Sequence, residues 1–114
     1  MKVAVVGSRN FNDYVRVKKA IDVIQSYVNI ECIVSGGAKG ADSLGAKYAD
    51  ENNIEKLIFL PEWNKYGRSA GFKRNKLIIE ACDFCIAFWD GKSKGTKHSI
   101  DLAKKLNKGL KIIQ

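Results

Sequence analysis

The sequence predicts an α/β fold, a three-layer sandwich in which helices cover both faces of a parallel sheet of about five strands. Short runs rich in valine and isoleucine alternate with segments whose apolar residues recur every three or four positions. Strands joined by helices favour right-handed crossovers and a parallel sheet, whose ligands bind outside the carboxyl ends of the strands. A chain of 114 residues fits a single domain over residues 1–114.

Five apolar runs are the predicted strands. Each is short, rich in valine, isoleucine or aromatic residues, and bounded by polar or glycine residues. They are Val3–Val6, Cys32–Val34, Leu57–Leu60, Phe84–Phe88 and Leu110–Ile113.

The first two predicted helices each carry their apolar residues on one stripe. The first follows Asn12 or Asp13, either of which can cap its N-terminus. Its stripe contains Val17, Ala20, Ile21, Ile24 and Val28. The stripe of the second contains Ala41, Leu44, Gly45, Tyr48 and Ala49. Because glycine costs about 1 kcal/mol relative to alanine inside a helix, Gly45 indicates close packing on the sheet.

The third predicted helix has Leu77, Ile78 and Ala81 on its apolar stripe. Arg74 lies on the same stripe, one turn nearer the helix start, so we expect its side chain to point toward the edge of the sheet. The fourth helix ends near residues 107–109, where asparagine and glycine are typical of a helix C-terminus. Its apolar stripe contains Thr96, Ile100, Ala103 and Leu106.

The composition is that of an ordinary globular protein, with 46% hydrophobic and 28% charged residues. No run approaches the ~20 apolar residues of a membrane span, and the apolar run at the N-terminus is too short for a signal peptide. We therefore expect a cytoplasmic protein with no membrane partner. Cys32, Cys82 and Cys85 lie in apolar runs and are expected to be buried free thiols. One Cys-x-x-Cys pair and one histidine do not predict a metal site.

The formal net charge of +8 is concentrated late in the chain. Lysines at 92, 94, 97, 104, 105, 108 and 111 are accompanied only by Asp90 and Asp101. A basic surface attracts nucleic acid and small phosphates alike, and a solvated lysine face is the commoner meaning of such a run. Charge alone therefore does not choose between these partners.

Three glycine-rich turns each follow a predicted strand and lead into a predicted helix. They are Gly7-Ser8-Arg9, Ser35–Asp42 and Phe88–Thr96. At the carboxyl edge of a parallel sheet, helix N-termini direct unpaired N–H groups and about half a positive charge each toward one region. Glycine allows an anion to reach the backbone. The three turns together predict a phosphate-binding pocket.

Two common nucleotide-binding motifs are absent. The glycines at 36, 37 and 40 lack the spacing of a dinucleotide-binding fingerprint. Gly91-Lys92-Ser93 resembles the end of a nucleoside triphosphatase phosphate loop, but Ile86 stands where that loop requires glycine. We expect neither a nucleoside triphosphatase nor a resident cofactor.

Two arginines are predicted to supply the charge of the pocket. Arg9 and Arg74 near helix N-termini indicate a phosphate ligand, although each also has carboxylates such as Asp42 or Asp90 as candidate partners. Either role predicts that both arginines are buried or half-buried. His98, just inside the fourth helix, is interpreted as a surface or capping residue and not as a catalytic base.

The remaining candidates each have a structural interpretation as well as a functional one. Asp42 is suited to accept hydrogen bonds from a ribose, or is favoured at a helix start by the helix dipole alone. Trp63 and Tyr66 are suited to stack on a base, or to pack on the domain or on a second subunit. Ser93 and Thr96 would donate hydroxyl hydrogen bonds to a phosphate.

The complete set of predicted ligand-binding residues combines the turns with these side chains. It consists of Gly7, Ser8, Arg9, Ser35, Gly36, Gly37, Ala38, Gly40, Asp42, Trp63, Tyr66, Arg74, Asn75, Trp89, Asp90, Gly91, Ser93, Gly95 and Thr96. No catalytic residue and no metal ligand is assigned.

Five blocks of sequence resemble the SLOG superfamily, and within it the family of unknown function named for YspA and related to cpYpsA. The blocks are Gly7–Tyr14, Ser35–Asp42, Pro61-Glu62-Trp63 with Tyr66-Gly67, Ala70–Asn75 and Ala87–Thr96. The resemblance implies a single Rossmann-like domain that binds nucleotides or nucleotide-derived ligands. It also implies roles in sensing or processing such ligands in bacterial and phage conflict systems. Relatives commonly pair through helices beside the pocket, so we expect a homo-oligomer, which the mass in solution from light scattering would test.

Two better-known relatives supply alternative functions. LOG-type phosphoribohydrolases carry a Gly-Gly-x-Gly-Thr-x-x-Glu turn with a catalytic glutamate, and this chain has Ser99 at that place. Binding without turnover is therefore favoured over hydrolysis of an N-glycosidic bond. The DNA-processing protein A family shares a turn similar to Ser35–Asp42 and handles single-stranded DNA, so nucleic acid is the alternative partner.

Overall fold

The computed structural model describes residues 1–114, and its five strands form one all-parallel sheet in the order β3-β2-β1-β4-β5. The strands are β1 (Lys2–Gly7), β2 (Cys32–Ser35), β3 (Glu55–Ile58), β4 (Phe84–Phe88) and β5 (Gly109–Ile113). The helices are α1 (Tyr14–Gln25), α2 (Ala41–Glu51), the short α3 (Trp63–Tyr66), the 3-10 turn η1 (Gly67–Ser69), α4 (Ala70–Ala81) and α5 (Lys94–Lys105). The predicted Rossmann-like α/β sandwich is confirmed.

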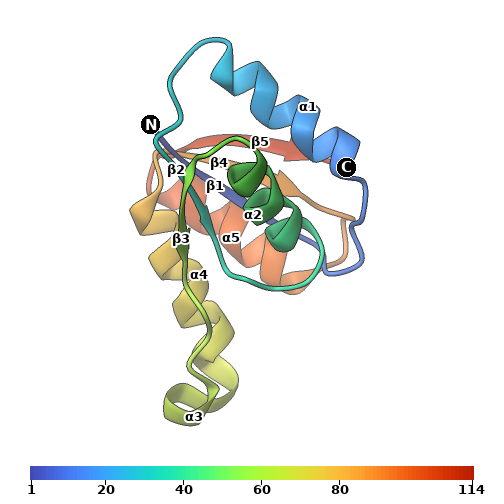
Figure 1. The fold of residues 1–114 in the computed structure, drawn as a ribbon. Coiled ribbons are helices and arrows are strands. Elements are labelled where there is room, and N and C mark those ends of the chain that lie inside the picture. The colour runs from blue at the N-terminus through green and yellow to red at the C-terminus, as the bar shows by residue number, and fades with distance from the viewer.

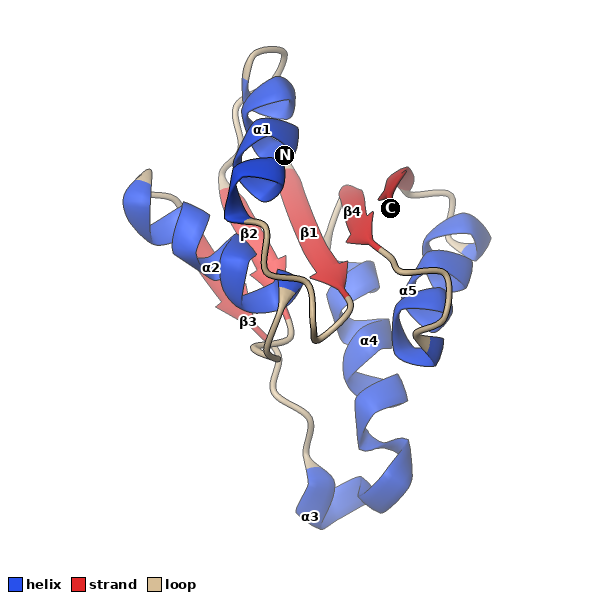
Figure 2. Cartoon of the chain, turned by 90° about the vertical axis from the view of Figure 1, so that its right-hand side faces the viewer, coloured by secondary structure: helices blue, strands red, loops and turns tan.

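Helices cover both faces of the sheet (Figures 1 and 2). On one face α1 and α2 pack on Val3 and Val5 of β1, and on the other α4 and α5 pack on Ala4 and Val6. This alternation follows from the two-residue period of a strand, which sends successive side chains to opposite faces. None of the helices has the length and hydropathy needed to cross a membrane.

Close packing explains the glycine within α2. A Cβ atom added at Gly45 would lie 2.7 Å from Cβ of Val5, so only glycine lets this helix approach β1 so closely. The predicted reason for Gly45 is confirmed. The three cysteines are free and buried, also as predicted.

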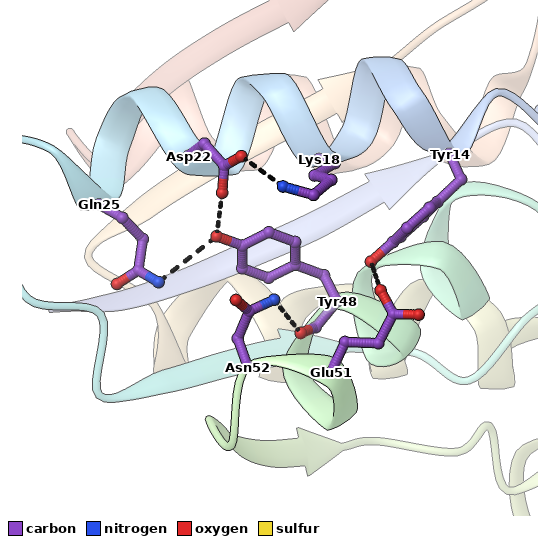
Figure 3. A network of polar contacts seen from close by, with 7 residues as sticks. All are labelled: Tyr14, Lys18, Asp22, Gln25, Tyr48, Glu51 and Asn52. Atoms are coloured by element: carbon purple, nitrogen blue, oxygen red, sulfur yellow. Dashed lines mark hydrogen bonds and ion pairs between the residues drawn. The ribbon is translucent and has the colours of Figure 1, made fainter.

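Polar side chains join α1 to α2 (Figure 3). The hydroxyl group of the buried Tyr48 donates to Oδ1 of Asp22 at 2.5 Å, and that of Tyr14 donates to Glu51 at 2.5 Å. Asp22 also forms an ion pair with Lys18 at 2.9 Å. These contacts fix α1 against α2 and thereby hold the loop that precedes α1.

Four sequence-based expectations about the elements need correction. The third strand begins two residues earlier than predicted and ends at Ile58, because β3 is an edge strand and its first two residues are charged. Leu77 is 48% exposed, since α4 turns that side away from the sheet. Val28 lies beyond the end of α1. Leu106 is the C-cap residue of α5, and its side chain is exposed.

The segment between β3 and α4 projects from the body of the domain. Figures 1 and 2 show α3 and the first part of α4 extending beyond the carboxyl end of the sheet. We call residues 63–74, which comprise α3, η1 and the start of α4, the arm. The arm gives the molecule its long dimension, with extents of 39 × 26 × 24 Å.

Candidate functional site

A cavity of about 540 Å³ lies at the carboxyl edge of the sheet. One wall comes from the loops that follow β1, β2 and β4, another from the first turn of α5, and a third from the arm. The volume falls within the range of roughly 300–1,000 Å³ that small-molecule sites occupy. This is the edge at which the glycine-rich turns predicted a pocket.

Twelve of the nineteen predicted ligand-binding residues line this cavity. They are Gly7, Ser8, Arg9, Ala38, Asp42, Trp63, Arg74, Asn75, Asp90, Ser93, Gly95 and Thr96. The other seven lie nearby without lining it: Ser35, Gly36, Gly37, Gly40, Tyr66, Trp89 and Gly91. Whether any of them binds a ligand remains a prediction.

Sequence reasoning missed six lining residues. They are Val6, Asn10, Arg68, Gly71, Phe72 and Ser99, the last of which was considered only as a replaced catalytic residue. A signal for three of them was present. Arg68, Gly71 and Phe72 precede Asn75 by seven, four and three positions, which is the spacing of one helix face. Following the face of Asn75, the neighbour of Arg74, toward the helix start would have found them.

Arg74 spans from α4 to the turn after β2. Its Nη1 donates to the carbonyl oxygen of Gly36 at 2.7 Å, and its Nε donates to Oδ1 of Asn75 at 3.1 Å. Arg74 is half-buried, as predicted. These bonds leave further guanidinium N–H groups, so the side chain is held in place at the cavity wall with donors to spare.

Asn75 connects this arginine to α5. Its buried amide donates from Nδ2 to the carbonyl oxygen of Gly95 at 3.3 Å, and Nδ2 also lies 3.3 Å from Nδ1 of His98. Burial lowers the pKa of His98, which favours the neutral ring that accepts this hydrogen bond. The asparagine therefore fixes the guanidinium group of Arg74 relative to the first turn of α5.

Arg9 does not meet its predicted burial. It lines the cavity but is exposed, and it lies in a turn in which the N–H group of Phe11 donates to the carbonyl oxygen of Ser8 at 3.2 Å. Neither Arg9, Arg68 nor Arg74 forms an ion pair with a carboxylate. Three guanidinium groups thus line one cavity without being neutralised by direct contact, against the two lining carboxylates of Asp42 and Asp90.

Asp42 is only 5% exposed and closes the turn after β2. Its Oδ2 accepts a hydrogen bond from the N–H group of Gly36 at 3.1 Å. Burial raises the pKa of Asp42 to about 6, although the charge of Arg74 and hydrogen bonds from the backbone of Gly36, Ala38 and Gly7 act in the opposite direction. The desolvated carboxylate therefore carries less than a full charge in mildly acidic solution.

The raised pKa of Asp42 predicts a specific pH dependence of stability. Since the folded pKa lies above the unfolded value of about 3.9, the folded state binds the proton more tightly, and the free energy of unfolding falls as pH rises from about 4 to about 6. The size is roughly 2–3 kcal/mol. Asp42→Asn should remove this pH-dependent component. The free energy of unfolding, measured with urea at pH 4.5 and at pH 7.5, should therefore fall less between these two pH values in the variant than in the wild type. Parallel pH profiles for the two proteins would contradict the assignment.

At three of the glycines in these turns, the space that a Cβ atom would need is occupied by other atoms of the protein, so it is not open to an anion. A Cβ atom at Gly36 would overlap Nη1 of Arg74, one at Gly7 would lie 2.5 Å from the carbonyl oxygen of Phe88, and one at Gly40 would overlap that of Ser8. Gly95 is different, because a Cβ there would meet nothing within 4 Å. Its position in the first turn of α5 faces the open cavity.

The first turn of α5 is capped by its own loop. Ser93 Oγ accepts from the N–H group of Thr96 at 3.4 Å and lies 3.1 Å from the hydroxyl oxygen of Thr96. Asp90 Oδ1 accepts from the N–H groups of Lys92 and Ser93, both at 2.8 Å, and these bonds hold the pKa of Asp90 below its usual range. The helix thus begins in a fixed position, with its positive end beside the cavity.

The chemistry available at this cavity is anion binding by arginine and a helix N-terminus, beside exposed aromatic rings. Trp63 and Phe72 of the arm are 52% and 49% exposed. No three His, Cys, Asp or Glu side chains lie close enough together to hold a metal ion. Ser99, at the place of the glutamate of LOG-type hydrolases, is buried and lines the cavity.

Comparison with known proteins agrees with the resemblance noted from the sequence. Residues 1–66 match the family described as YAcAr: YspA, cpYpsA-related SLOG family. The chain is also 32% identical over 111 residues to the Gene 61 protein of Mycobacterium phage D29, covering 91% of this chain and 89% of the phage protein.

Two solved structures share the fold. DNA processing protein A (DprA) from Streptococcus pneumoniae superposes with a TM-score of 0.80 at 23% identity, over 99% of this chain. DNA processing protein A from Helicobacter pylori gives a TM-score of 0.72 at 23% identity over 98% of this chain. That structure is described as showing a unique single-stranded DNA binding mode. The chain spans 50% and 64% of the lengths of those two chains, so the match concerns a common domain.

Proposed function

Because the chain belongs to the YspA, cpYpsA-related SLOG family, we propose that it binds a nucleotide or nucleotide-derived ligand at the C-terminal edge of its sheet. It would act there as a sensor or as a protein that sequesters the ligand. The observation that carries this proposal is the convergence of Arg9, Arg68, Arg74 and the N-terminus of α5 on one cavity of about 540 Å³. Guanidinium groups and helix N-termini both favour phosphate.

The proposal assigns each part of such a ligand to a group of lining residues. A phosphate would lie between Arg74 and the first turn of α5, where Gly95 leaves space. A ribose hydroxyl would donate to the carboxylate of Asp42. A base would stack on Trp63 in preference to Tyr66, since Tyr66 does not line the cavity and Lys65 and Lys73 lie 5.1 and 4.7 Å from the centre of its ring.

A thermal-shift screen of AMP, ADP, NAD, ADP-ribose, cyclic nucleotides and short single-stranded DNA tests the proposal, and Gly95 supplies the diagnostic variant. Gly95 lines the cavity and a Cβ atom there would meet nothing within 4 Å, so we expect Gly95→Leu to fill part of the cavity. We expect it to abolish the nucleotide-induced shift, which at 100-fold over Kd corresponds to about 2.7 kcal/mol. The unliganded variant should melt no lower than the wild type, because leucine favours a helix over glycine by several tenths of a kcal/mol.

Gly95→Ala is the matched control. It adds only a methyl group, so it should raise the melting temperature slightly and retain most of the ligand-induced shift. A screen in which no nucleotide stabilises the wild-type protein would refute the proposed function. If the nucleotide shifts the melting temperature of Gly95→Leu as much as that of the wild type, the nucleotide binds outside this cavity.

Binding of single-stranded DNA is the second candidate function. The exposed rings of Trp63 and Phe72 share the arm with Arg68, Lys65 and Lys73, and bases stack on such rings beside cations. The Helicobacter pylori protein of similar fold is described as binding single-stranded DNA. A shift with the oligonucleotide alone, and an affinity that falls steeply with salt, would favour this candidate.

Hydrolysis of an N-glycosidic bond is supported less well. Ser99 supplies a hydroxyl group where the LOG-type mechanism needs a carboxylate, and Asp101 does not line the cavity and pairs with Lys97 at 2.9 Å. Recovery of intact nucleotide after long incubation would agree with binding alone, whereas free base or sugar phosphate in the products would establish turnover.

A further inference from the structure

A second, smaller hollow adjoins the main cavity. We call it the side compartment; its volume is about 220 Å³, and its lining residues are Phe11, Asn12, Asp13, Arg16, Trp89 and Gln114, together with Ser8, Asn10 and Asp90. The last three also line the main cavity. The two hollows therefore meet at a common wall, where the N–H group of Asp90 donates to Oγ of Ser8 at 3.3 Å.

The side compartment lies where the sheet topology favours binding. Its walls come from the loop after β1 and the loop after β4, with the end of β5 behind them. These two central strands are neighbours, but the chain leaves β1 for α1 on one face and β4 for α5 on the other. Parallel sheets bind ligands in the crevice at such a switch point. The main cavity extends from this crevice toward α4 and α5, and the side compartment extends toward α1.

The size of the side compartment indicates an extension and not an independent site. At about 220 Å³ it is smaller than the roughly 300 Å³ at which sites for whole ligands begin. It has room for one ring. A ligand that reaches it from the main cavity must cross the wall at Ser8 and Asp90, beside the N-terminus of α5, whose positive end favours a phosphate linkage. The negative charge of Asp90 opposes a phosphate there, and it is offset in part by the N–H groups of Lys92 and Ser93 that donate to Oδ1 of Asp90.

The lining of the side compartment is suited to a hydroxyl-bearing ring. Seven of its nine residues are polar or charged, and the carboxamide groups of Asn10 and Asn12 can both donate and accept hydrogen bonds. The carboxylate of Asp13 caps α1 through one oxygen and leaves the other as an acceptor. The guanidinium carbon of Arg16 lies 5.9 Å from the centre of the Phe11 ring, whose partner at 4.8 Å is Phe88. Phe11 packs between these neighbours, and the other aromatic lining residue, Trp89, donates from Nε1 to the carbonyl oxygen of Ser93 at 3.0 Å. The polar lining residues outnumber these two rings, which favours hydrogen bonding to hydroxyl groups over base stacking.

We propose that the ligand is a nucleoside diphosphate that carries a second, sugar-like ring, and that this ring occupies the side compartment. The inference rests on the proposed function, because the nucleotide part must occupy the main cavity. It narrows the ligand class from nucleotides in general to nucleotides extended beyond their phosphates.

Calorimetric titration of ADP against ADP-ribose, and of UDP against UDP-glucose, tests the inference. We expect the sugar-extended member of at least one pair to bind roughly tenfold more tightly or better, from a few hydrogen bonds to its hydroxyl groups. Asn12→Trp should fill the side compartment, so the sugar-extended nucleotide should bind this variant only as tightly as its parent diphosphate does. The affinity of the parent diphosphate itself should be the same for the variant and the wild type. Asn12 is exposed and lines only the side compartment. Lys19→Trp is the control, since Lys19 is an exposed residue of α1 that lines neither hollow.

The outcomes separate this inference from the proposed function. Equal affinity within both pairs, or an advantage of the extended ligand that survives Asn12→Trp, would overturn the inference and leave nucleotide binding in place. Absence of binding by all four compounds, together with a negative nucleotide screen, would refute the proposed function and the inference with it.

Discussion

Replacing Arg74 with alanine is expected to weaken nucleotide binding by roughly 10- to 150-fold, the equivalent of losing one charged hydrogen bond or pair worth about 1.5–3 kcal/mol. Arg74 is the lining arginine that the fold holds most firmly, through its bonds to Gly36 and Asn75 and its half-buried position. Its donors are therefore in place before a phosphate arrives. Titration calorimetry with the nucleotide that gives the largest thermal shift would measure the loss.

The controls separate charge from structure. Lys76→Ala removes a cation from an exposed position of the same helix that does not line the cavity, so binding should change little. Arg74→Lys keeps the charge but loses the fork of donors, and it should restore only part of the affinity. If Lys76→Ala and Arg74→Ala weaken binding equally, the nucleotide is responding to net charge and not to a built site.

The central strands and the glycine turns were predictable from the sequence because local chemistry determines them. Val3–Val6 and Cys85–Phe88 are buried on both faces, which leaves an uninterrupted apolar signal. The edge strand β3 lacks that signal, since both Glu55 and Lys56 are exposed and the apolar run begins only at Leu57. Its position is instead determined by pairing with β2, in which Cys32 lies opposite Glu55.

The composition of the cavity was harder to predict, because the arm depends on tertiary structure. Spacing places Arg68 and Phe72 on one helix face with Asn75, but nothing local to these residues indicates that α3 and the start of α4 project beyond the sheet (Figure 2). The exposure of Arg9 likewise depends on the turn that the loop after β1 makes at residues 8–11. The sequence predicted turns at Gly36 and Gly40 because glycine allows an anion to reach the backbone. In the structure these two glycines instead allow segments of the chain to approach each other closely.

Gly40→Ala tests that structural role and is expected to destabilise the fold by roughly 2–6 kcal/mol. Gly40 has φ 83° and ψ −134°, which lies outside the left-handed helical region in a part of backbone space used almost only by glycine, and which costs an L-residue about 1–3 kcal/mol. Its added Cβ would also overlap the carbonyl oxygen of Ser8 and lie 2.6 Å from that of Arg9. Because both obstacles are backbone atoms, relief requires moving the loop after β1, at a further cost of about 1–3 kcal/mol.

Gly91→Ala is the matched comparison, since Gly91 has nearly the same φ, 81°, but nothing within 4 Å of an added Cβ. It should lose only the conformational part, about 1–3 kcal/mol. Urea unfolding of both variants would measure the difference, which is the cost of separating the loops after β1 and β2. Equal destabilisation would show that φ alone requires glycine at residue 40. A larger loss in Gly40→Ala would show that this glycine holds together two walls of the cavity, so its effect on nucleotide binding would follow from the fold and not from contact with the ligand.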